Sequence, residues 1–225
     1  DNEGEDFSEY FSVTDNTPPT VEIIAPQPGA SLIIGSSASV SWTESDNVGV
    51  VQRYYQYDAG SGWTDMTLDS VFTESVWFTV PNTPTDNFGV RVMVEDAVGL
   101  KDTTAVSGIN VVIEYPRILT ADSSLVSLST SEVDLEFSVA MDPESFSGIE
   151  LNSSVSGALA FTAEAVTAAL VRFRLSQQLI SRDTLSMTLS ASTLLSSFGY
   201  GIDGNGNGVS EGSPTDDVVL TFFVE

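Results

Sequence analysis

The sequence predicts an all-β chain that folds into two consecutive antiparallel β-sandwiches. Apolar and polar residues alternate through most of the 225 residues, and this period of two is typical of strands with one buried face. Short turns rich in Gly, Asn, Asp and Pro separate the alternating segments, at the spacing expected of sandwiches. Two linker-like passages divide the chain, one at residues 14–20 and one around Tyr115 and Pro116.

Each expected strand rests on a local alternation. Trp42 alternates with Val40, Ala38 and intervening serines, which places its ring in the core. Further alternating segments lie at residues 88–94, 133–139, 171–175 and 185–189. Residues 16–115 hold about seven strands, the number of an immunoglobulin-like sandwich of about 100 residues. Residues 116–225 give a similar count, so we expect two immunoglobulin-like sandwiches in sequence.

The charge of the chain limits its partners. There are 32 Asp and Glu residues against 7 Lys and Arg, a formal net charge of -25. Such a surface repels nucleic acid and anionic lipid and attracts divalent cations. A solvated acidic surface, as in proteins adapted to salt, explains the bulk charge equally well. No apolar run approaches the length of a membrane span, so no direct membrane insertion is expected.

The absence of two residue types argues against an enzyme. The chain has no histidine and no cysteine, which excludes disulfides, the common zinc sites, thiol nucleophiles and His-based triads. Glycoside hydrolysis needs only two carboxylates, but no motif selects a pair in so acidic a chain. The glycines of residues 201–208 alternate with Asp and Asn and precede a strand, which suits a cation better than a phosphate. We therefore expect a non-catalytic protein.

Residues 203–217 form a candidate calcium loop. Side-chain oxygens alternate with glycines there, a spacing at which a curled loop can point them to one centre. The pattern follows an EF-hand loop, but Pro214 replaces the bidentate Glu at the twelfth position and no helix flanks it. A glycine-rich loop held by Asx turns is the alternative. The candidate ligands are Asp203, Asn205, Asn207, Val209 through its carbonyl, Glu211, Asp216 and Asp217.

A second candidate calcium site lies in the first sandwich. The segment before the first strand, the B–C loop and the F–G loop emerge at the same end of an immunoglobulin-like sandwich. The acidic and amide residues of these segments repel one another unless a cation lies among them. Ordinary turn formation by Asp and Asn is the alternative. The candidate ligands are Asp15, Asn16, Asp46, Asn47 and Asp96, with Glu44 and Glu95 beside them.

The start of the chain resembles the end of the first sandwich. Residues 1–4 and 11–13, an Asp-x-x-Gly turn and a strand, match residues 96–99 and 109–111. We expect residues 1–15 to be the last strand of a preceding module plus a linker, in a tandem array. Chance agreement over so few positions is the alternative.

Longer motifs resemble known families. The segments TDNTPPTVEIIAPQPGASLIIG, VSWTESDNVGV and FGVRVMVEDAVG, within residues 14–113, resemble the immunoglobulin-like or fibronectin-III-like modules of bacterial secreted and surface proteins. The segments VDLEFSVAMDPESF, DTLSMTLSAS and DGNGNGVSEG resemble the bacterial immunoglobulin-like domain of surface-layer proteins, more loosely. The resemblance implies non-catalytic spacers, stalks or adhesive modules outside the cell, with neighbouring modules as partners.

Exposed aromatic residues raise a second possibility. Trp77 is expected to point outward because Val76 and Phe78 take the inward face, and Tyr54 belongs to an aromatic cluster. Trp63 follows an Asp-box-like turn, which gives it a structural role. Exposed rings can stack on sugars, although a lone tryptophan more often packs on a neighbouring strand or module. The sequence thus predicts a calcium-stabilised spacer or adhesion segment, with a carbohydrate-binding or accessory module of an extracellular hydrolase as the alternative.

Overall fold

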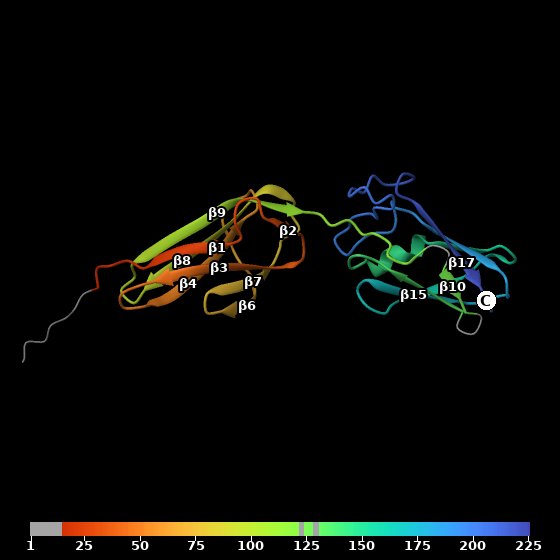
Figure 1. The fold of residues 1–225 in the computed structure, drawn as a ribbon, viewed down its shortest axis with the longest axis horizontal. Helices are drawn as coiled ribbons and strands as arrows, with labels where there is room; N and C mark the ends of the chain where they lie inside the picture. Colours follow the sequence, from red (N-terminus) through yellow and green to blue (C-terminus); the bar gives the residue numbers. More distant parts are fainter. Residues whose placement is uncertain (1–14, 122–123, 128–130) are drawn as a thin grey trace, which may run out of the picture. The chain divides into compact units, whose positions relative to one another are not determined.

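The computed structural model describes residues 15–121, 124–127 and 131–225 (Figure 1). The strand expected within residues 1–15 lies almost wholly outside these ranges and stays a prediction. The chain forms two compact units that divide between Ile113 and Glu114. Figure 1 draws the first from red to yellow-green and the second from green to blue. Nearly all regular structure is β-strand, so the predicted all-β fold class is confirmed.

Two sheets build the first unit. One has four strands in the order β1-β3-β7-β6, and the other has five in the order β2-β9-β8-β4-β5. All pairs are antiparallel except β2 with β9. This order places strands A, B, E and D of an immunoglobulin-like sandwich on one sheet and C, F and G on the other. The strands are β1 (Thr20–Ala25), β2 (Ser31–Ile33), β3 (Ser37–Ser45), β4 (Val50–Asp58), β5 (Thr64–Asp65), β6 (Leu68–Phe72), β7 (Ser75–Thr79), β8 (Thr85–Asp96) and β9 (Lys101–Val112).

Alternation along the strands fills the core between these sheets. Trp42 on β3 is buried, as the sequence predicts, and its ring centroid lies 5.2 Å from that of Tyr55 on β4. Phe78 on β7 and Phe88 on β8 stack with centroids 6.4 Å apart. These rings come from both sheets, so the hydrophobic effect holds the two layers face to face.

The second unit repeats the strand order of the first. A five-stranded sheet has the order β10-β17-β16-β12-β13, and a three-stranded sheet has the order β11-β15-β14. β10 pairs in parallel with β17, as β2 does with β9. The strands are β10 (Ser124–Val126), β11 (Glu132–Glu136), β12 (Glu150–Ser153), β13 (Gly157–Ala158), β14 (Phe161–Ala165), β15 (Leu170–Leu175), β16 (Thr184–Leu189) and β17 (Val218–Val224).

Short elements complete this unit. A single bridge between Ile118 and Phe137 takes the place of a first strand beside β11. The 3-10 helix η1 (Pro143–Gly148) begins after Asp142, whose side chain accepts a hydrogen bond from the Glu144 N–H. No helix in the described ranges is long and apolar enough to span a membrane.

The two faces of β15 have different roles. Phe173 points into the core and meets Phe146 and Phe161 edge to face. Arg172 and Arg174 point outward and form ion pairs with the carboxylates of Glu132 and Asp134 on β11. The register places Arg174 opposite Glu132 and Arg172 opposite Asp134, and Arg172 also reaches Glu132 diagonally at 3.3 Å.

Candidate metal centre

Three aspartates from distant parts of the sequence meet in the first unit. Asp15 precedes β1, Asp46 lies in the loop between β3 and β4, and Asp96 ends β8. One carboxylate oxygen from each aspartate lies within 4.8 Å of the corresponding oxygens of the other two. No other group of three acidic residues within the described residues is this close together. The immunoglobulin-like topology brings these segments together, because the start of β1 and the B–C and F–G loops share an end of the sandwich.

Two of these carboxylates have a buried oxygen without a partner. Asp96 is 2% exposed; its Oδ1 accepts hydrogen bonds from the N–H groups of Val98 and Leu100 at 2.9 and 2.8 Å. Its Oδ2 is buried and accepts none. Asp46 repeats the arrangement: Oδ2 accepts from Val48 and Gly49, and Oδ1 is buried and unpaired. A buried carboxylate oxygen without a donor costs free energy, and a cation would remove that cost.

Asp15 completes the set from another direction. Its Oδ1 accepts hydrogen bonds from the Thr17 N–H at 3.0 Å and the Asn47 side-chain amide at 3.2 Å. These bonds hold the segment before β1 against the loop that contains Asp46. The backbone N–H groups of Gly49 and Val48 also hold the pKa of Asp46 below its usual value, so this carboxylate is ionised at neutral pH.

The donor set fits calcium. Carboxylate oxygens are hard ligands, and the spacing can be spanned from one centre by calcium–oxygen bonds of about 2.3–2.6 Å. Calcium takes six to eight oxygens, so the amide oxygens of Asn16 and Asn47, backbone carbonyls and water would supply the remaining positions. Both asparagines lie at the exposed edge of the cluster.

The structure keeps two neighbouring glutamates away from this cluster. Glu44 accepts hydrogen bonds from the Arg53 guanidinium and from the Trp42 indole N–H. Glu95 forms an ion pair with Lys101 and accepts a hydrogen bond from the Tyr54 hydroxyl. Each glutamate is thus paired with a cation, and neither belongs to the group formed by Asp15, Asp46 and Asp96.

The candidate loop of the second unit lies between β16 and β17 and is internally hydrogen-bonded. Asp203 is 3% exposed, and its two oxygens accept from the N–H groups of Gly206, Asn207 and Gly208 at 2.8 to 3.1 Å. Asp216 is fully buried and accepts from the N–H groups of Asn205 and Glu211. Both carboxylates are thus engaged by backbone donors of their own loop.

The remaining predicted side-chain ligands of this loop also accept hydrogen bonds. Asn205 Oδ1 accepts from the Asn207 N–H, and Asn207 Oδ1 accepts from the Val209 N–H, which are Asx turns. Glu211 accepts from the Asn205 side-chain amide, and Asp217 accepts from the Ala191 N–H. Calcium at residues 203–217 stays a prediction, and binding there would have to replace several of these hydrogen bonds.

The two candidate ligand-binding aromatics lie on different sheets. Trp77 is on β7 of the four-stranded sheet and is 40% exposed, as expected from the alternation. Tyr54 is on β4 of the five-stranded sheet, where Lys101 Nζ lies 5.3 Å from its ring centroid. The two rings therefore do not form one surface. Trp63 has the expected structural environment: it lies against Gly89, and the Arg91 guanidinium stacks on it at 4.4 Å.

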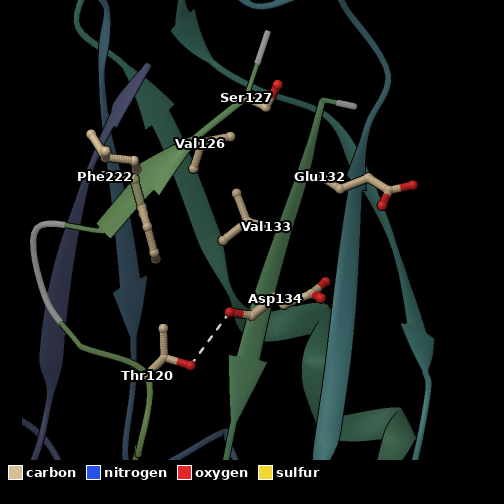
Figure 2. Close-up of a pocket in the computed structure, with 8 residues that line it drawn as sticks. Thr120, Val126, Ser127, Glu132, Val133, Asp134 and Phe222 are labelled. Atoms are coloured by element: carbon tan, nitrogen blue, oxygen red, sulfur yellow. Dashed lines mark hydrogen bonds between the residues drawn. The ribbon is translucent and has the colours of Figure 1, made fainter. Parts of the chain in front are cut away.

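A pocket of about 370 Å³ opens in the second unit between β10 and β11 (Figure 2). Val126, Val133 and Phe222 line it with side chains that belong to the hydrophobic core. Figure 2 also shows the Thr120 hydroxyl donating to the Asp134 carbonyl across one wall. Among the described residues that line it, the two carboxylates of Glu132 and Asp134 pair with arginines of β15.

Comparisons with known proteins extend this picture only at the level of the fold. No family model and no curated protein matches the sequence. Among solved structures, a chimeric titin Z1Z2 is similar over 92% of this chain and 97% of its own, at 12% identity and a TM-score of 0.42. The fibronectin(III)-like modules of Clostridium thermocellum CbhA are similar over 92% of this chain and 94% of their own, at 10% identity and a TM-score of 0.32. Bacteroides ovatus SGBP-B, solved with a mixed-linkage heptasaccharide, is similar over 89% of this chain and 48% of its own. The sequence identity is 13% and the TM-score is 0.29. The scores are low, so the immunoglobulin-like assignment rests on the strand order of each unit.

Proposed function

We propose that the chain is a non-catalytic, calcium-stabilised pair of immunoglobulin-like modules that acts as a spacer or adhesion segment of a secreted or cell-surface bacterial protein. The observation that carries the proposal is the cluster of Asp15, Asp46 and Asp96 with its two unpaired buried oxygens. An acidic cluster at a surface needs no ion, but buried carboxylate oxygens without donors favour one.

Calcium at this cluster would have a mechanical role. It would join the segment before β1 to the loop between β3 and β4 and to the end of β8, three segments that are far apart in sequence. Pro18 and Pro19 lie between Asp15 and β1 and restrict the backbone of this segment. Ion binding at this end would thus resist the pulling of β1 away from the sandwich, as a spacer under load requires.

The charge and composition agree with this role. A net charge of -25 keeps neighbouring modules apart in solution and concentrates divalent cations near the surface. Calcium is abundant outside cells, where sites of the extracellular class bind with dissociation constants of about 10⁻⁴–10⁻³ M. We therefore place the protein outside the cell, with further modules of the same chain as its neighbours.

Single-molecule pulling and hydrogen exchange test this function together. With calcium, the first unit should unfold at a higher force than in EDTA, and the amides of Val48, Gly49, Val98 and Leu100 should exchange more slowly. The second unit is measured separately in the same molecule, because residues 203–217 are themselves a candidate calcium loop. Equal unfolding forces and equal exchange in calcium and EDTA would refute the calcium-stabilised spacer.

A further inference from the structure

The outer face of the four-stranded sheet carries chemistry that the spacer function does not use. β3 turns Ala38, Val40 and Trp42 inward. Its outer face carries a row of hydroxyls, of which Ser37 and Thr43 are exposed and Ser39 and Ser41 are half-buried. The hydroxyls of Ser39, Ser41 and Thr43 make no hydrogen bond to another described residue. They are therefore available to a ligand.

Trp77 lies at the middle of this face. The register places Ser39 of β3 on one side of it and Ser70 of β6 on the other. Both neighbours are small, and the ring is 40% exposed although it projects from a central strand. Trp63 is exposed to a similar extent, at 37%, but the Arg91 guanidinium already lies over one face of its ring. An uncovered indole between small polar residues is a stacking platform.

A second ring and a carboxylate lie beside the platform. Phe72 of β6 is 57% exposed and faces Ser75, which makes it the diagonal neighbour of Trp77 on the same face. Asp69 lies at the bulge of β6 and accepts hydrogen bonds from the Thr79 hydroxyl at 3.2 to 3.3 Å. Its carboxylate is exposed, so it has capacity for further donors.

Charge selects the class of ligand. The cationic side chains of residues 15–113 are Arg53, Arg91 and Lys101, and all three lie on strands of the five-stranded sheet. The face around Trp77 carries carboxylates without a compensating cation, which disfavours nucleic acid, anionic lipid and acidic polysaccharide. A second copy of this chain, with its net charge of -25, is disfavoured for the same reason. A neutral ligand with many hydroxyl donors has no such penalty.

The face is long enough for an extended ligand. A shallow pocket of about 270 Å³ lies over β1 and β3, lined by residues 20–22 and 43–45. From Ser39, opposite Trp77, to Thr43 at this pocket is four residues of β3, or about 13 Å at about 3.3 Å per residue. The free hydroxyls of β3 line the path, and the Glu22 carboxylate lies at its far end.

We propose that this face binds a neutral oligosaccharide segment, with one sugar ring stacked on Trp77. The apolar face of the sugar ring contacts the indole, Phe72 flanks it, and sugar hydroxyls donate to the carboxylates of Asp69 and Glu22. The hydroxyls of Ser39, Ser41 and Thr43 form hydrogen bonds with the sugar units that lie between Trp77 and Glu22. This activity goes beyond the spacer function and does not depend on the calcium cluster.

Affinity electrophoresis tests the proposal with the full chain in calcium-containing buffer. The probes are neutral polysaccharides, namely mixed-linkage β-glucan, xyloglucan, galactomannan and dextran, with polygalacturonate as the anionic comparison. Wild-type protein should be retarded by at least one neutral polymer and not by the anionic one. Trp77→Ala should reduce the affinity by more than about tenfold, Trp77→Tyr should retain part of it, and Asp69→Asn should weaken it.

Phe198→Ala is the matched control, because it removes an exposed ring that belongs to the second unit and not to the proposed face, and it should leave retardation unchanged. Melting curves establish that each variant folds. The proposal is overturned by wild-type protein that no neutral polymer retards, by preference for polygalacturonate, or by equal retardation of wild type and Trp77→Ala. Sedimentation showing a dimer that Trp77→Ala dissociates would also overturn it, since a second copy would then cover the face.

Discussion

Replacement of Asp96 by Asn should change stability in opposite directions with and without calcium. Asp96 Oδ1 accepts two backbone hydrogen bonds, and an asparagine oxygen can accept the same two. The uncharged asparagine also removes one negative charge from the cluster of three carboxylates. In EDTA the variant should therefore melt at or above the wild-type temperature, because repulsion between the carboxylates falls.

In calcium the same variant should lose the metal-dependent stabilisation. At free calcium about 100-fold above the dissociation constant, binding contributes about 2.7 kcal/mol. For a domain of about 100 residues each kcal/mol shifts the melting temperature by about 4–8 °C. The first unit of the wild type should thus melt about 10–20 °C higher in calcium than in EDTA. Asp96→Asn should show little of this difference.

Calorimetric melting of wild type, Asp96→Asn and Asp65→Asn in both buffers measures these effects. Asp65 is an exposed carboxylate of the same unit that bonds only to the Gln56 side chain, so its variant should keep the full calcium shift. If Asp96→Asn destabilises the first unit equally in calcium and EDTA, the residue has a structural role alone. Calcium binding at Asp15, Asp46 and Asp96 would then be refuted.

Three predictions concern the second unit. Asp203→Ala removes the acceptor of three backbone N–H groups and should destabilise this unit by about 1–3 kcal/mol in calcium and EDTA alike; a loss confined to calcium would make the loop a metal site. Gly204→Ala should lower the free energy of unfolding, measured by chemical denaturation, more than Gly206→Ala does. A Cβ at residue 204 would lie 2.1 Å from the Asp216 carbonyl oxygen, whereas a Cβ at residue 206 would meet no atom within 4 Å. The Ser213 hydroxyl and a backbone N–H hold the pKa of Asp217 below its usual value. Its stabilisation is present above the unfolded-state pKa of about 3.9 and is lost as pH falls through the lower folded pKa. Asp217→Asn should flatten the acid decline in melting temperature below about pH 4, and an unchanged decline would contradict this assignment.

Much of the fold can be predicted from local pattern. The alternation around Trp42, Phe78 and Phe173 predicts which face of each strand is buried, and the structure buries all three rings. The outward position of Trp77 follows from the same alternation. Such predictions succeed because the side-chain period of a strand is fixed at two, so one buried residue determines the orientation of its neighbours.

The sites could be predicted only in part. The immunoglobulin-like topology predicts that Asp15, Asp46 and Asp96 lie at one end of the first sandwich, and the structure has the three carboxylates close together. The prediction also included Glu44 and Glu95, which Arg53 and Lys101 remove from the cluster. Spacing alone cannot predict which carboxylate pairs with a cation, because the pairing depends on side chains of adjacent strands.

The sequence by itself determined the strand content, the inward face of each strand and the excess of acidic residues over cationic ones. Only the tertiary structure decided how each oxygen is used. In the loop at residues 203–217 the alternating oxygens accept hydrogen bonds from their own backbone, whereas Asp46 and Asp96 each retain a buried oxygen without a donor. The physical reason is that hydrogen-bond satisfaction depends on the position of every nearby donor in three dimensions, which one-dimensional spacing does not specify.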